Sequence, residues 1–135
     1  MSVWFARLLT FGTATLLMLS LTDDRLTAHH SFAAEYDSQA PITISGEVSK
    51  VEWTNPHTYV YVDTKDTIGK VVTWSFEGYP PNTLKRTGIP RDLLKVGDII
   101  TITGWKARFT ANRAAGREIT LPDGKRVFLG PAASY

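Results

Sequence analysis

Three histidines are the side chains in this sequence best suited to chemistry. His29 and His30 are adjacent, and His57 follows the segment Trp53–Pro56. If a leader is removed after Ala28, the mature chain begins with His29, whose α-amine and ring nitrogen can bind one metal ion together. Imidazole suits copper and zinc, and copper binds more tightly than most divalent ions at such sites. The histidines therefore predict a copper site with His29, His30 and His57 as its ligands.

The same histidines also have ordinary structural interpretations. His29 and His30 can form a solvated chain start, since chain termini fray unless they are tied down. His57 can bond a backbone group where the next strand begins. Both interpretations stay open beside the predicted metal site.

Aromatic and charged residues indicate a second possible site, a groove that holds a small ligand or a protein. Aromatic side chains on a β-sheet surface can stack sugars, bases or other planar groups. Core packing is the alternative for Trp53 and Trp74, which are in phase with apolar neighbours. Cross-strand packing is the alternative for Tyr59 and Tyr61. The candidate groove residues are Trp53, Asn55, Tyr59, Tyr61, Glu77, Arg113 and Arg117.

The N-terminal segment has the order of an export signal. Met1–Arg7 is short and positively charged, and Leu8–Leu21 is an uncharged apolar run. This order is typical of a secretory signal, and the run is shorter than the ~20 residues that a membrane-spanning helix needs. We expect cleavage after Ala28, although a cut after Ala33 places the small residue Ser31 at the favoured position and removes both N-terminal histidines. The expected location is the periplasm or the outside of a bacterial cell.

With cleavage after Ala28, residues 1–28 are the signal and residues 29–135 form one domain of ordinary size, with no stable membrane span. The sequence has no cysteine, so neither a disulfide nor a thiolate ligand is available. The net charge of +2 is spread along the chain, which argues against nucleic acid as a partner. No G-x-S-x-G, Walker or zincin motif occurs. Binding of a metal ion or a small ligand is therefore favoured over enzymatic catalysis.

Alternation of apolar and polar residues predicts β-strands along most of the domain. In Ile42–Trp53 the alternation slips by one residue after Val48, which predicts a β-bulge. Asn82 is placed to cap a short helix through Arg86, and a second helical turn is expected at Arg91–Lys95. The other expected strands are Thr58–Val62, Val72–Phe76, Ile99–Thr103, Gly116–Leu121 and a short one at Val127–Leu129.

This order of elements predicts an all-β domain, a small OB-like barrel of five to six strands with a short helical insert. Closing a small sheet on itself removes exposed strand edges. Gly104 is expected to let its strand bend, and Phe109–Ala115 is expected to be a loop. A β-sandwich is the alternative, but it needs more strands and no helical insert.

Several motifs resemble those of a bacterial family of short exported proteins of unknown function. The resemblance covers nearly the whole mature chain and implies an envelope location and a β-barrel-like domain. It implies no activity, because the family has none assigned. The motifs that carry it are Ala28–Asp37, Gly46–Val48, Val51–His57, Leu94–Asp98, Asn112–Ala115 and Leu121–Gly124.

Overall fold

The computed structural model describes residues 32–130. The predicted signal, its cleavage after Ala28, and the predicted ligands His29 and His30 lie outside the described residues. Contacts within the chain separate a unit that ends at Ala34 from one that begins at Glu35, and the second unit contains all the strands found among residues 32–130. Among residues 32–130, no helix is long and apolar enough to cross a membrane.

The first strand, β1 (Tyr36–Trp53), is long and joins two parts of the sheet. Its first part pairs with β4, its last part pairs with β2, and Glu47 pairs with both neighbours. The register with β2 shifts between Val48 and Lys50, so the predicted β-bulge is confirmed. A bulge bends a strand, and this bend lets one strand serve two neighbours. The strand begins at Tyr36, earlier than its alternation predicted, because residues 37–40 form an irregular stretch opposite β4.

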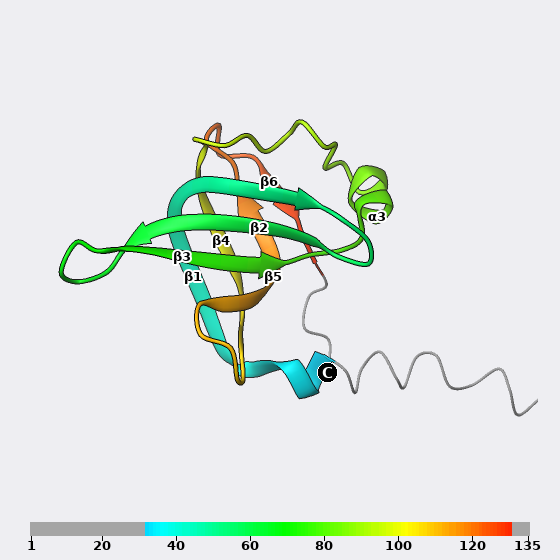
Figure 1. Ribbon diagram of the computed structural model, residues 1–135. Coiled ribbons are helices and arrows are strands. Elements are labelled where there is room, and N and C mark those ends of the chain that lie inside the picture. Colours follow the sequence, from blue (N-terminus) through cyan, green and yellow to red (C-terminus); the bar gives the residue numbers. More distant parts are fainter. Residues whose placement is uncertain (1–31, 131–135) are drawn as a thin grey trace, which may run out of the picture. The chain divides into compact units, whose positions relative to one another are not determined.

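The strands form one sheet in the order β3-β2-β1-β4-β5-β6, and all consecutive neighbours are antiparallel. A short parallel pairing between β3 and β5 joins the sheet to itself, so that five strands form a ring (Figure 1). The predicted all-β, OB-like order with a helical insert is thereby confirmed. The remaining strands are β2 (Thr58–Lys65), β3 (Val71–Glu77), β4 (Ile99–Ala107), β5 (Arg113–Thr120) and β6 (Arg126–Phe128).

The fifth strand begins at Arg113, three residues before its predicted start, so the prediction of a loop through Ala115 was wrong. Residues 113–115 pair with β3 on one side, and β4 pairs with part of the same stretch on the other. Ala114 and Ala115 are buried there. These small side chains have little intrinsic preference for strands, and the pairing on both edges places them in the sheet. Asn112, with φ of 53°, makes the turn that precedes the strand.

The helical insert differs from its prediction in two places. Helix α3 (Pro81–Arg86) is preceded by Pro80 as its N-cap residue, so Asn82 does not cap it. Proline fits the first helical position because its φ is fixed near the helical value. The second predicted helical turn, Arg91–Lys95, is not a helix. That segment is held by its turn instead, since the Lys95 amide donates to the Asp98 carboxylate at 2.9 Å.

The core lies inside the ring and continues under α3. Leu84 of the helix is completely buried against it, and burial of one such side chain contributes roughly 1.5–3 kcal/mol. Trp53 and Trp74 are partly buried and pack against the core, as their phase predicted. Gly104 lies where the register between β4 and β5 shifts, and a Cβ atom there would be 2.0 Å from the Ala115 carbonyl oxygen. The strands therefore approach this closely only because position 104 is glycine.

Candidate functional site

His57 leads into β2, and two acceptors beside its Nδ1 hold the ring. The Asn55–Pro56 peptide before it is cis, and the Thr54 hydroxyl donates to the His57 carbonyl oxygen at 3.0 Å. Ring atom Nδ1 lies 3.2 Å from the Gly78 carbonyl oxygen and 3.3 Å from Glu77 Oε1. Both of these oxygens accept hydrogen bonds, so Nδ1 carries a proton and donates. In the neutral ring the lone pair is then on Nε2, and the side chain is 44% exposed.

Glu77 links His57 to further side chains. Its Oε2 accepts a hydrogen bond from Arg113 Nη2 at 2.6 Å and another from the Tyr36 hydroxyl. Arg113 Nε also donates to the Tyr36 hydroxyl oxygen, at 3.1 Å. The Arg113 guanidinium lies 5.6 Å from the centre of the Tyr59 ring. These residues, Tyr36, His57, Tyr59, Glu77 and Arg113, form what we call the Glu77 cluster.

Closure of the ring brings the Glu77 cluster together from separate elements. Tyr36 begins β1, Glu77 ends β3 and Arg113 begins β5. The antiparallel register of β2 and β3 places Tyr59 opposite Glu77. The parallel register of β3 and β5 places Arg113 opposite Ser75, which precedes Glu77 by two residues and lies on the same face of β3. The cluster therefore exists only when the β3–β5 pairing has formed.

Burial and electrostatic contacts fix the protonation states of three members. Burial raises the pKa of the Tyr36 hydroxyl well above its ordinary value, and its hydrogen bond to Glu77 raises it further. For Arg113, burial acts to lower the pKa, but the hydrogen bonds to Glu77 and Tyr36 outweigh burial and the pKa is raised. Burial, followed by the charge of Glu77, also raises the pKa of Tyr59. The two tyrosines are therefore neutral and the guanidinium is charged at physiological pH.

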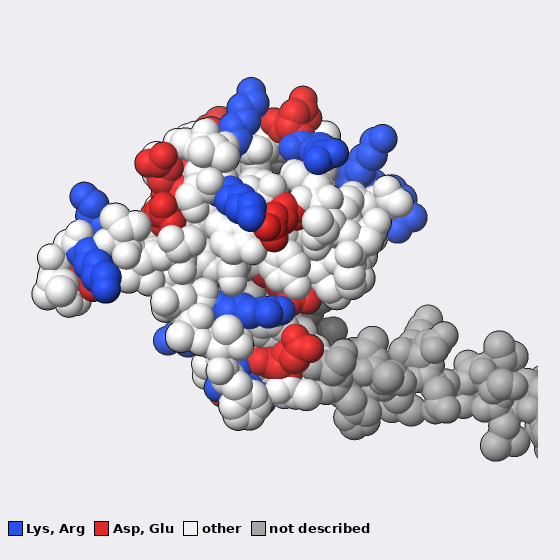
Figure 2. Space-filling view, viewed as in Figure 1, with Lys and Arg blue, Asp and Glu red and all other residues white. Residues whose placement is uncertain are grey.

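Basic and acidic side chains are interspersed on the face of the molecule drawn in Figure 2. Arg113 illustrates this at short range, because its Nη2 lies 2.6 Å from Glu77 Oε2 and 4.0 Å from Glu35 Oε2. Two negatively charged carboxylates thus lie beside one positively charged guanidinium. An anionic ligand would have to compete with both of them for Arg113.

The structure brings some of the predicted groove residues together and places the others elsewhere. Tyr59, Glu77 and Arg113 are in the Glu77 cluster with His57. Trp53 packs against the core, and Asn55 is exposed beside the cis peptide. Tyr61 donates a hydrogen bond to Glu52 Oε2 at 3.0 Å, and Arg117 lies 5.9 Å from the Trp105 ring.

Sequence reasoning missed Tyr36, which is 4% exposed and central to the cluster. The alternation that marked β1 began only at Ile42, and nothing local connected Tyr36 with Glu77, 41 residues later. The only sequence feature that could have identified Tyr36 is its place in the Ala28–Asp37 segment, one of the motifs that resemble the family.

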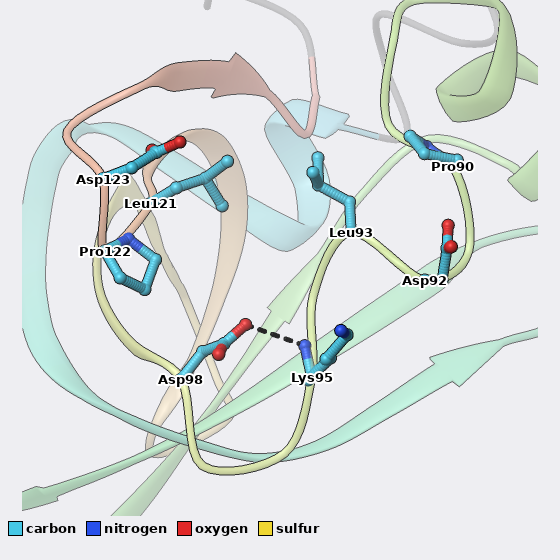
Figure 3. A pocket seen from close by; sticks show the side chains of 8 residues that line it. All are labelled: Pro90, Asp92, Leu93, Lys95, Asp98, Leu121, Pro122 and Asp123. Carbon is cyan, nitrogen blue, oxygen red and sulfur yellow. Dashed lines mark hydrogen bonds between the residues drawn. The ribbon is translucent and has the colours of Figure 1, made fainter.

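A concave region lies between the segment after α3 and the β5–β6 turn (Figure 3). We call it the Asp98 hollow, and its volume is about 490 Å³. Two of its carboxylates are already used by their own turns: Asp98 Oδ2 accepts from the Lys95 amide, and Asp123 Oδ1 accepts from the Lys125 amide, both at 2.9 Å. Its lining residues are Pro90, Asp92, Leu93, Lys95, Asp98, Leu121, Pro122 and Asp123.

Within residues 32–130, no group of three or more histidine, cysteine, aspartate and glutamate side chains is placed to hold a metal ion. His57 is the one predicted metal ligand in the described part of the chain.

A family of unknown function, DUF6152, matches residues 17–116. The chain belongs to DUF6152. The match covers about three quarters of the sequence, since it spans 100 of 135 residues (116 − 17 + 1 = 100). It includes each histidine and all members of the Glu77 cluster, and it confirms the resemblance to a family without an assigned activity. Comparison of this DUF6152 chain with curated proteins and with solved structures gave no match.

Proposed function

We propose that this protein is an exported metal-binding protein of the bacterial envelope that binds copper through His57, His29 and His30. The observation that carries the proposal is the orientation of the His57 ring. Its Nδ1 is held by the Gly78 carbonyl oxygen and by Glu77, which leaves the Nε2 lone pair for a metal ion. A role in copper handling or sensing follows from such a site.

The contacts of His57 match those of histidines that bind metals. Such a histidine almost always donates its other ring N–H to a carboxylate or a backbone carbonyl, which fixes the tautomer and the ring orientation. His57 has both kinds of acceptor beside Nδ1. Glu77 is in turn held by Arg113 and Tyr36, so the carboxylate that orients the ring is itself oriented.

The start of the folded unit supports participation of the N-terminal histidines. Glu35 Oε2 lies 4.0 Å from Arg113 Nη2. Arg113 forms an ion pair with Glu77, and Glu77 lies beside His57. His29 precedes Glu35 by six residues (35 − 29 = 6), and six residues span at most about 20 Å. A chain that begins at His29 is therefore long enough for its amino terminus to meet His57.

The ligand chemistry favours copper. An N-terminal histidine offers its α-amine and a ring nitrogen, and His57 adds another imidazole nitrogen. Copper lies at the top of the affinity order for divalent metals at nitrogen ligands. These nitrogens bind metal only when deprotonated, so affinity should fall on acidification.

A second candidate function is that of a binding module for a planar ligand or a protein segment. The Arg113 guanidinium above the Tyr59 ring favours it, because this pair offers a flat cationic and aromatic surface. The two carboxylates beside Arg113 weaken it for anionic ligands. Binding of this kind would depend on Tyr59 and not on the histidines.

Intact-mass spectrometry of protein exported by a bacterial host, with and without copper, tests the first proposal. We expect a mature mass that begins at His29 and gains one copper ion. His57→Ala removes a proposed ligand, so copper affinity should fall by more than the roughly 10- to 100-fold that loss of an orienting partner costs. Lys85→Ala, at an exposed position of α3, serves as the control. A mature chain that begins at Ala34, or a His57→Ala variant with unchanged affinity, would contradict it.

A further inference from the structure

The outer edge of β3 carries backbone groups without a strand partner. The Ser75 amide donates to the Asn112 carbonyl oxygen at 2.9 Å, on the side where β5 lies. Amides and carbonyls of alternate residues in a strand point to the same side, so those of Val71 and Thr73 point the same way as that of Ser75. The pairing with β5 begins only at Ser75. Among the described residues, no strand therefore pairs with the outward side of Val71 and Thr73.

This edge belongs to a hairpin that projects from the ring. Figure 1 shows the β2–β3 hairpin extending past β1, with the lower edge of β3 uncovered there. Val71 is 55% exposed, and Ile68 at the hairpin tip is 84% exposed. Exposed apolar side chains thus accompany the unpaired backbone groups.

The sequence of the edge favours pairing with another strand. Val71–Ser75 consists of β-branched and aromatic residues with one serine, and it contains neither charge nor proline. Proteins usually protect free edges with lysine, proline, bulges or very short strands. An edge of this composition is the kind that accepts an added strand.

The other free edges in the described part of the molecule carry such protection over part of their length. The part of β1 before Glu47 pairs only with β4, and it contains Asp37 and Pro41. Strand β6 has three residues, and its Arg126 is paired with Glu118. Residues 42–46 of β1 carry neither charge nor proline, but among the described residues exposed large apolar side chains accompany the free edge of β3 and not that of β1.

We propose that the Val71–Ser75 edge pairs antiparallel with the same edge of a second copy of this chain, with the two-fold axis at Val72. In this register Val71 faces Thr73 of the second copy, and Thr73 faces its Val71. The outward amides and carbonyls of both residues then exchange hydrogen bonds in reciprocal pairs. Because the segment is uncharged, the two-fold axis brings no like charges together, and the edge is complementary to itself. This dimer is independent of metal binding.

Sedimentation velocity over a concentration series tests the dimer, with the whole exported protein. We expect a monomer–dimer equilibrium that Val71→Pro shifts to monomer, with a dissociation constant raised at least about tenfold. Proline is tolerated at the first residue of a strand, and the amide that it removes points outward. Val71→Thr keeps that amide and a β-branched side chain, so it should remain dimeric. Circular dichroism checks that both variants fold.

Cross-linking gives a second test that does not depend on Val71→Pro folding. The chain has no cysteine, so Val72→Cys introduces a single thiol at the proposed axis. Mild oxidation should give a covalent dimer of Val72→Cys and not of Thr43→Cys, which places a thiol on the free edge of β1, away from the proposed axis. A monomer at every concentration, a dimer unaffected by Val71→Pro, equal cross-linking of both cysteine variants, or a monomer that pairs only with a different protein would each overturn the proposal.

Discussion

The Glu77 cluster and the Asp98 hollow both place carboxylates at the surface of the folded unit, but these carboxylates have different kinds of partner. Asp98 and Asp123 accept hydrogen bonds from amides two or three residues away. Glu77 bonds Tyr36 and Arg113, which are 41 and 36 residues away. A carboxylate that caps its own turn stabilises local structure. One that joins three strands can orient a side chain such as His57.

The largest effect that separates the two regions is expected from Glu77→Ala. This variant leaves Arg113 and Tyr36 without their shared acceptor and releases His57 Nδ1. Loss of hydrogen bonds to a charged group should cost about 3 kcal/mol in the free energy of unfolding, measured by urea denaturation. Copper affinity should fall at least about tenfold in a titration. If Glu77→Ala lowers the stability but leaves copper affinity unchanged, the cluster stabilises the fold and does not orient a metal ligand.

A smaller effect is expected from Arg113→Lys. Lysine keeps the positive charge but cannot reproduce the two donors that reach Glu77 and Tyr36. We expect a loss of about 1.5 kcal/mol in urea denaturation. Arg117→Lys on the same strand is the matched control and should be nearly neutral. If both variants behave alike, geometry at Arg113 is unimportant and only charge matters.

Asp98→Ala tests the other side of the comparison. It removes the acceptor of the Lys95 amide, and loss of one such exposed turn bond should cost about 1 kcal/mol of stability. Copper affinity should stay at the wild-type value in the titration used for Glu77→Ala. A drop in affinity here would show that the metal ion binds at the hollow.

The smallest effect concerns alkaline pH. Because burial raises the pKa of Tyr36 in the folded state, the unfolded chain loses this proton first as pH rises past about 10. Folding stability is therefore fully present below that pH and declines above it. Near pH 10, where the unfolded chain has lost about half of this proton, Tyr36→Phe should remove about 0.7 kcal/mol of the decline per pH unit. The difference between the unfolding curves of the two proteins measures it. Identical slopes would mean that the hydroxyl is not held in the cluster.

Much of the fold could be predicted because its strands are marked by local alternation. The bulge of β1 followed from a slip in phase after Val48, and Val72, Trp74 and Phe76 marked β3. The start of β5 could not be predicted in this way. Ala114 and Ala115 carry no strand signal, and they lie in the sheet because two neighbouring strands pair with them.

The candidate site was predictable in part. His57, Tyr59, Glu77 and Arg113 were each identified by residue type, but their assembly was not. It depends on the register that sets Tyr59 opposite Glu77 and on the parallel pairing that closes the ring. Pairings between residues so distant in the sequence leave no periodic pattern in it.

The most direct test of the proposed metal site is nuclear magnetic resonance of the His57 ring nitrogens in the exported protein, with Zn²⁺ as a diamagnetic probe. The chain has three histidines, so His57→Ala assigns the signals. We expect a proton on Nδ1 in the metal-free protein and a large shift of the Nε2 signal alone when metal is added. A proton on Nε2, metal bound at Nδ1, or ring signals unchanged by metal would contradict the proposed metal site.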